Sequence, residues 1–194
     1  MPMKLTILSD NNTLIDQYLL GEPGFSCLIE TEGKRFLLDT GYFGIFAKNA
    51  ETLGLDWRNV DAVVLSHCHD DHTKGLDAFF TEGKKPALVA HPALFRRLWS
   101  RGLPIGCPYP RSRVERYFDL CLTAEPMALT ENLFYLGAIP RVFPDQQDLT
   151  VREGDGMCSP PTTPPSPIGG RRESMSSPAA PTAASPTSAS RPRR

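Results

Sequence analysis

Three histidines and two aspartates occupy a run of six residues, HCHDDH at positions 67–72. Neutral imidazole and carboxylate groups bind Zn²⁺, iron and manganese, so this run predicts a divalent metal site. His67 and His69 are two residues apart, and on an extended segment their rings point to the same side. We expect them to hold one ion, with Asp71 and His72 reaching a second position. Two ions about 3.5–4 Å apart could share a water and lower its pKa to about 7.

Other polar residues in or near this cluster each have two interpretations. Cys68 and Asp70 are expected to point away from the metal, with thiolate ligation by Cys68 as a second option. His91 follows a short apolar run and either faces a cleft or serves packing. Asp10 lies in a turn-prone Ser-Asp-Asn-Asn segment and is either a turn former or a site residue. For the cluster itself, the alternative is a polar loop whose histidines bind no metal.

The cluster must be positioned by the elements on either side of it. Residues 61–66 are apolar on both faces, which is typical of a strand covered on both sides. A helix is predicted to begin near Thr73 and to carry Leu76, Phe79 and Phe80 inward.

Further elements follow from the same patterns. Strands are predicted at residues 4–8, 25–31 and 35–39, the last two flanking a Glu-Gly-Lys turn, and at residues 87–90. Helices are predicted near residues 45–53, ending at Gly54, and at residues 92–99. Residues 100–112 are expected to form a surface loop, and a second sheet is expected from residues 117–122, 127–129 and 133–136. Strands and helices that mix without strict alternation favour a layered α/β fold.

Composition divides the chain in two. Every aromatic residue lies at or before Phe143, and Ile168 is the only branched aliphatic residue after position 157. Such a segment buries too little apolar surface to offset roughly 1–2 kcal/mol of backbone entropy per residue. We therefore expect a partial domain over residues 1–157 and a disordered tail rich in Pro, Ser, Ala and Arg over residues 158–194.

The codon pattern of the tail suggests an origin for it. Nearly all of its residues can be encoded with C or G in the middle codon position, as happens when a GC-rich gene is read in a shifted frame. Our hypothesis is a truncation or frameshift after about residue 156, and a natural linker is the alternative.

Charge and cysteine usage limit the function classes. The formal net charge is −1, and the basic residues of the tail offset an acidic folded part, which does not suggest a nucleic-acid surface. Five cysteines show no CxxC pairing. There is no signal-peptide pattern and no apolar run of spanning length. These features predict a cytoplasmic protein with reduced thiols.

Residues 66–72 resemble the signature of the metallo-β-lactamase (MBL) superfamily. The strand end Leu-Leu-Asp-Thr-Gly at 37–41 is similar to an earlier Asp-containing strand end of that superfamily. This similarity implies that Asp39 orders the metal loop, residues 67–72, without binding the ion. Residues 8–13, 21–26, 39–42 and 136–141 resemble one subgroup. It contains the dihydropterin-linked ribofuranosylaminobenzene phosphate synthases and many MBL-fold metallo-hydrolases.

The resemblance covers roughly residues 3–156 and implies an αββα sandwich, of which this chain holds the N-terminal half to two-thirds. It also implies further ligands in the second half: a His, a bridging Asp and a late His. The last His of this chain is His91. Where the subgroup has Gly-Cys-Ser-His, residues 156–161 read GMCSPP.

The resemblance therefore implies a metal-dependent hydrolase-like protein, related to pterin-pathway synthases, in which Asp71 also orients the attacking water. Zinc is favoured, with iron and manganese as alternatives, and an intact relative would hold one or two ions. We expect a small-molecule substrate, a pterin or a phosphorylated aromatic, with neither nucleic acid nor membrane as partner; the oligomeric state is left open. The alternative is a catalytically inactive truncated remnant that binds metal weakly or acts only as an interaction fragment.

Overall fold

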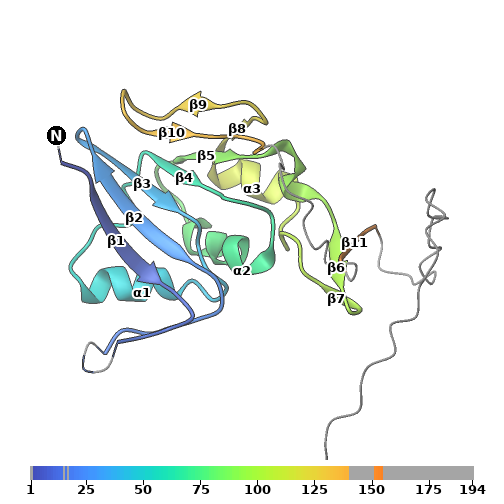
Figure 1. The fold of residues 1–194 in the computed structure, drawn as a ribbon, viewed down its shortest axis with the longest axis horizontal. Helices are drawn as coiled ribbons and strands as arrows, with labels where there is room; N and C mark the ends of the chain where they lie inside the picture. The colour runs from blue at the N-terminus through green and yellow to red at the C-terminus, as the bar shows by residue number, and fades with distance from the viewer. Residues whose placement is uncertain (1, 15, 17, 140–150, 155–194) are drawn as a thin grey trace, which may run out of the picture. The chain divides into compact units, whose positions relative to one another are not determined.

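A six-stranded mixed sheet forms the centre of the computed structural model, in the order β1-β2-β3-β4-β5-β8 (Figure 1). The structure describes residues 2–14, 16, 18–139 and 151–154, which lie in one compact unit, Met1–Cys158. The expected tail, residues 158–194, lies outside the described residues. The six strands are β1 (Lys4–Ser9), β2 (Ser26–Thr31), β3 (Lys34–Leu38), β4 (Ala62–Val64), β5 (Ala87–Ala90) and β8 (Asp119–Leu122).

The sheet combines an antiparallel part with a parallel part. β1, β2 and β3 are antiparallel neighbours, and the predicted hairpin between β2 and β3 is confirmed. Its turn places Glu32 and Gly33 at positive φ, 51° and 73°, and the glycine adopts that conformation at no steric cost. β3, β4, β5 and β8 run parallel. The carboxyl ends of these four strands therefore meet at one edge of the sheet.

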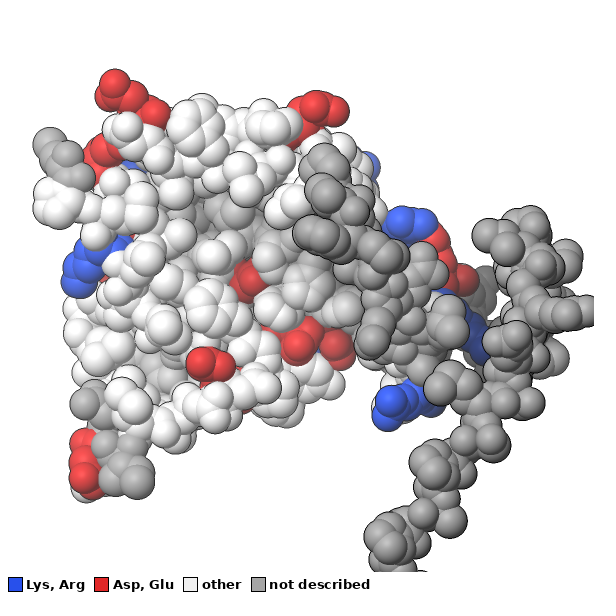
Figure 2. Space-filling model, viewed as in Figure 1, with Lys and Arg blue, Asp and Glu red and all other residues white. Residues whose placement is uncertain are grey.

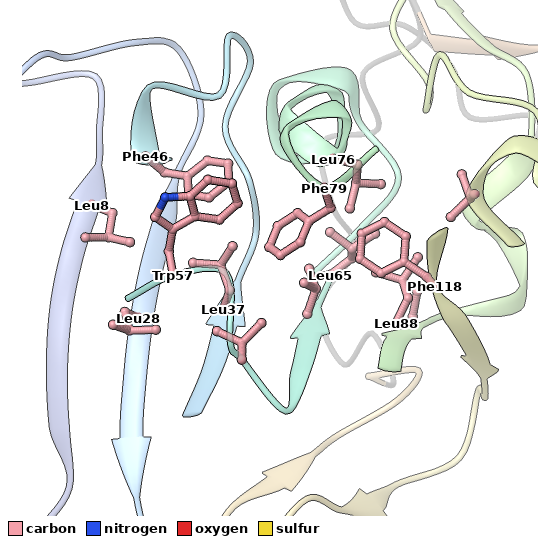
Figure 3. Packing of buried hydrophobic residues seen from close by; sticks show 14 of the residues in the cluster. Leu8, Leu28, Leu37, Phe46, Trp57, Leu65, Leu76, Phe79, Leu88 and Phe118 are labelled. Carbon is pink, nitrogen blue, oxygen red and sulfur yellow. The ribbon is translucent and has the colours of Figure 1, made fainter. Parts of the chain in front are cut away.

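The helices cover one face of the sheet and enclose the main core. Trp57 packs edge-to-face against Phe46 and Phe79, with ring centroids 5.2 and 5.0 Å away. The buried strand residues Leu37 and Leu88 belong to the same cluster (Figure 3). The helices are α1 (Ile45–Thr52), α2 (Asp70–Thr73) and α3 (Arg111–Tyr117), with the 3₁₀ helices η1 (Lys74–Phe79) and η2 (Pro92–Phe95). No helix within the described ranges is long and apolar enough to cross a membrane.

A β-hairpin lies against the opposite face of the sheet. Its strands are β9 (Met127–Ala128) and β10 (Phe134–Tyr135), and Tyr135 packs in a second apolar cluster with Phe36, Val64 and Val89. A small third sheet joins β11 (Val151–Glu153), β6 (Leu98–Ser100) and β7 (Leu103–Pro104). This layering of helices and sheet confirms the predicted α/β class.

Several predicted boundaries were wrong. The helix expected near Thr73 begins earlier, at Asp70, and continues as a 3₁₀ helix. The helix expected over residues 92–99 ends at Phe95 because residues 98–100 pair with two other strands. The expected loop, residues 100–112, contains β7 and the start of α3. The strand expected at residues 117–122 joins the main sheet as β8, so it is not part of a second sheet.

Candidate metal centre

The metal-type residues lie where the parallel strands end. Asp39 directly follows β3, and its N–H donates to the carbonyl oxygen of Val64 at 2.9 Å, which continues the pairing with β4. Leu65 N donates in the same way to Val89 O of β5 at 2.9 Å. His67 comes two residues further on, so the loop leaves the sheet beside Asp39 and beside the end of β5.

Three donor groups converge in this loop. One ligand atom from each of His67, His69 and Asp71 lies within 4.8 Å of the others. The rings of His67 and His69 have centroids 4.7 Å apart. Two imidazoles and a carboxylate are a donor set that suits zinc, and also iron or manganese. Within the described residues, this is the one group of three such donors that could hold an ion.

His72 lies beside this group but is held by a different partner. Its Nδ1 is 2.8 Å from Oδ2 of Asp39, while its Nε2 is 3.7 Å from a carboxylate oxygen of Asp71. The His67 and His72 rings have centroids 4.2 Å apart. The close group thus joins His67, His69 and Asp71, whereas the sequence prediction divided the four residues into two pairs.

Asp39 ties the strand end to the loop. Its Oδ1 accepts from Ser66 N at 2.8 Å, and its Oδ2 accepts from the Ser66 hydroxyl at 2.6 Å. The carboxylate is buried and therefore needs such donors. The Ser66 Oγ in turn lies 2.9 Å from Nδ1 of His67. One buried carboxylate therefore orients His72 directly and contacts His67 through a hydroxyl.

The pKa values of His67 and His72 are shifted in opposite directions. Withdrawal from solvent lowers the pKa of His67, and the neighbouring His72 and His69 lower it further. A lowered pKa favours the neutral ring, which is the form that binds a metal. Burial also acts to lower the pKa of His72, but the hydrogen bond and the charge of Asp39 outweigh it, so that pKa is raised.

Backbone contacts fix the loop on both sides. Thr40 donates to the carbonyl oxygen of His72 from its N–H at 3.0 Å and from its hydroxyl at 2.9 Å. Asp70 N donates to Ile105 O at 2.8 Å. Two glycines allow backbone to approach backbone here: a Cβ at Gly24 would collide with the carbonyl oxygen of Asp71, and one at Gly75 with that of Thr40.

The remaining candidates lie outside the donor group. Cys68 packs against the main core, as expected of a side chain that points away. Asp10 caps its own turn by accepting from Asn11 N, and the neighbouring Asn11 accepts from Gly24 N at 2.9 Å. His91 lies at the end of β5, where its Nδ1 accepts from Ala93 N at 3.1 Å.

Sequence reasoning missed the roles of Ser66, Thr40 and the two glycines. Ser66 is part of the family motif but has no predicted role of its own, yet it links Asp39 to His67. Its place directly before His67 was the available signal. The glycines gave no signal, because their role depends on segments far apart in the chain.

Comparison with known proteins gives a family match and several relatives. The family model of the metallo-beta-lactamase superfamily matches residues 19–157. The anti-Pycsar protein Apyc1 of Paenibacillus harenae is 33% identical over 101 residues, which are 49% of this chain and 41% of that protein. The 7,8-dihydropterin-6-methyl-4-(β-D-ribofuranosyl)-aminobenzene-5′-phosphate synthase of Methanocaldococcus jannaschii is 32% identical over 100 residues, 48% of this chain and 34% of the synthase.

A solved structure shares the fold. Tm1679, described as a metal-dependent hydrolase of the β-lactamase superfamily, superposes with a TM-score of 0.58 at 25% identity. The match covers 69% of this chain and 47% of Tm1679. The matched part of this chain therefore spans less than half the length of each of these three relatives.

Proposed function

The chain belongs to the metallo-β-lactamase superfamily, and we propose that it is a metal-dependent hydrolase-like protein whose ion is held by His67, His69 and Asp71. The observation that carries this proposal is the convergence of their three donor atoms within 4.8 Å. When bound, a divalent ion would supply Lewis acidity and lower the pKa of water to about 7. Zinc suits this donor set best, with iron and manganese as alternatives.

The chain's own residues supply the positioning. His67 and His69 offer neutral imidazole nitrogens, and the lowered pKa of His67 supports that form. Asp71 offers a carboxylate that can hold the ion and accept a hydrogen bond from an attacking water. Asp39 holds His72 at 2.8 Å, which leaves the Nε2 of that ring directed to the side of Asp71. We propose His72 and Asp71 as the start of a second metal position.

The substrate is proposed to be a small molecule. Similarity to the M. jannaschii synthase supports a pterin or a phosphorylated aromatic. A cytoplasmic location remains our expectation.

A second candidate function is a remnant without catalysis that binds metal weakly. Three protein donors with water in the fourth position are what a catalytic zinc site uses, so the donor count itself fits the hydrolase. The alternative is supported by coverage, because the matched part of this chain spans less than half of each of the three relatives compared.

Metal content separates the two candidates. The purified chain, residues 1–194, is loaded with Zn²⁺, desalted and subjected to elemental analysis beside a His67→Ala/His69→Ala variant and a His91→Asn control. We expect about one equivalent of zinc in the parent and the control and a trace in the double variant. Chromogenic carboxylic and phosphoric esters then test hydrolysis by the loaded protein.

The metal contents of the parent and the variants test the ligands and the number of metal positions. Retention of the metal in the double variant would overturn the assignment of His67 and His69. Substoichiometric metal in the parent, without hydrolysis, would favour the remnant, and two equivalents would support the second position at Asp71 and His72.

A further inference from the structure

A cavity of about 250 Å³ lies directly beside the metal loop. Both His67 and His91 line it, one from each of two neighbouring strand ends. His67 belongs to the proposed metal site, whereas His91 has no role there. The cavity is therefore placed to hold the part of a substrate that adjoins the reacting group.

The lining indicates which chemistry fits. Most of the wall is apolar, contributed by Leu65, Ala90, Leu94 and Ile139 among others, and the ring of Tyr135 is also part of it. Among the described residues that line it, none is Lys, Arg, Asp or Glu. Apart from an ion at the metal site, a charged group would lose its hydration here without gaining a counter-charge from the described lining, which is costly. The wall therefore favours an uncharged, largely apolar group.

His91 adds one directed polar group to this wall. Its Nδ1 accepts a hydrogen bond from Ala93 N at 3.1 Å, which caps η2. A neutral imidazole carries one proton, so a ring whose Nδ1 accepts has its proton on Nε2. Within the described residues, this Nε2 has no partner. An N–H donor that is held in a fixed orientation and is free to bind is what an acceptor atom of a ligand requires.

We propose that this cavity binds an uncharged aryl or acyl group bearing a carbonyl or ring-nitrogen acceptor, and that His91 positions it by donating from Nε2. His91 would thereby set specificity for the acceptor, while its neighbour His67 lies on the side of the reacting group. The proposal deepens the proposed function and rests on it only for that orientation. A phosphate of the same substrate would lie outside the cavity.

Nuclear magnetic resonance of the full chain tests the proposal without catalysis. Benzamide serves as the probe because it joins an apolar ring to an uncharged carbonyl acceptor, and benzoate is its anionic match. We expect benzamide to shift the His91 Nε2 and the Ala93 amide signals. Benzoate should bind at least about tenfold more weakly, a difference of about 1.4 kcal/mol.

Variants of His91 separate its role as a hydrogen-bond donor to the ligand from its role as the cap of η2. Asn is a good N-cap, so His91→Asn keeps an acceptor for Ala93 N but is too short to reach the ligand. We expect it to fold and to weaken benzamide binding about tenfold, whereas His91→Gln retains part of the affinity. Ile139 is 72% exposed, so Ile139→Lys tests the cavity independently. This variant should gain affinity for benzoate.

The outcomes separate the assignment of the cavity from the proposed function at the metal site. Equal binding of benzamide and benzoate, or full affinity in His91→Asn, would overturn the assignment of the cavity. A zinc titration of the same samples reports on the metal site. Benzamide binding without zinc binding would sink the proposed function and keep the cavity, and zinc binding without benzamide binding would do the reverse.

Discussion

Asp39 is held in an unfavourable backbone conformation for the sake of its carboxylate. Its φ is 56°, a left-handed value that costs a non-glycine residue of order 1 kcal/mol. In return, the side chain accepts from Ser66 N, the Ser66 hydroxyl and His72 Nδ1. Asp and Asn tolerate this conformation better than other side chains with a Cβ. Of these two side chains, only that of Asp has two acceptor oxygens. The hydrogen bonds to Ser66 and His72 therefore require Asp at this position.

This arrangement predicts the effect of Asp39→Asn. The amide keeps one acceptor oxygen but places an NH₂ group where an oxygen now accepts from two donors. We expect zinc affinity to fall about 10–100-fold, as for other groups that orient metal ligands, with a smaller loss of stability. Competition against a chromophoric chelator measures the affinity, and urea unfolding measures the stability.

Asp119→Asn is a matched control, because Asp119 is an exposed aspartate at the start of β8. Unchanged zinc affinity in Asp39→Asn would mean that the histidines hold their orientation without Asp39.

Glu22 gives a prediction for pH dependence. Its side chain is buried, and this burial raises its pKa above 4.5, against the effect of the hydrogen bond donated by Phe43 N. A raised pKa means that the folded state binds the proton more tightly than the unfolded state. The associated stability is fully present below pH 4.5 and is lost as the pH rises through the folded pKa.

Glu22→Gln removes this ionisation. The free energy of unfolding of the variant, relative to the parent, should therefore increase between pH 4 and pH 7, because only the parent loses stability there. Urea unfolding at several pH values measures the difference. Glu82→Gln reports the effect of the same replacement on a side chain that is 97% exposed. A difference for Glu22 that stays flat with pH would contradict the prediction.

At the scale of elements, the sheet edge brings the site together. The ends of β3, β4 and β5 carry Asp39, the metal loop and His91, respectively. The sequence predicted these strands because the hairpin alternates and because residues 61–66 and 87–90 are short apolar runs. It predicted the cluster because the donors are adjacent in sequence. It could not predict that Asp39 and His72 meet, because that contact depends on the order of the strands.

The elements that sequence reasoning missed lack a strong local signal. In α3, Val114 is the one buried residue, so its helical period is barely visible in the sequence. Residues 98–100 follow a Pro-initiated helical pattern, but they become β6 because they pair with both β7 and β11. Tertiary pairing overrides local propensity there. For a segment as short as residues 98–100, the strands available for pairing decide whether it forms a strand.

Gly75 marks where two elements touch, and it predicts a stability effect. It follows α2 within η1, and a Cβ at this position would collide with the carbonyl oxygen of Thr40. Neither backbone can yield without breaking the bonds between Thr40 and His72. Gly75→Ala should therefore destabilise the chain by about 3 kcal/mol or more, measured by urea unfolding.

The hairpin glycine offers a control for this effect. Gly33 has a positive φ of 73°, and a Cβ at this position would meet no other atom within 4 Å. Gly33→Ala should therefore cost only about 1–2 kcal/mol of backbone strain. Equal losses in the two variants would show that the close approach at Gly75 relaxes easily.

At the scale of the whole described unit, the two faces of the sheet are covered unequally. Helices bury one face, whereas the β9–β10 hairpin covers only part of the other. Leu5 and Ile7 of β1 lie opposite Ile29 and Cys27 of β2, on the hairpin's side of the sheet. They are 61% and 57% exposed. Figure 2 shows that the face turned to the viewer is mostly uncharged, with a few Asp and Glu side chains near its middle.

An open apolar face of this kind favours association. Two such faces would bury each other at the spacing of packed sheets, about 10 Å, so we expect a mass that rises with protein concentration. Leu5→Thr/Ile7→Thr places β-branched residues suited to a strand and removes apolar surface, and should weaken association several-fold. Sedimentation over a concentration series measures this. Leu103→Thr is the control, since Leu103 is 67% exposed on β7. If the control weakened association as much as the double variant, the open face of β1 would not be the surface responsible.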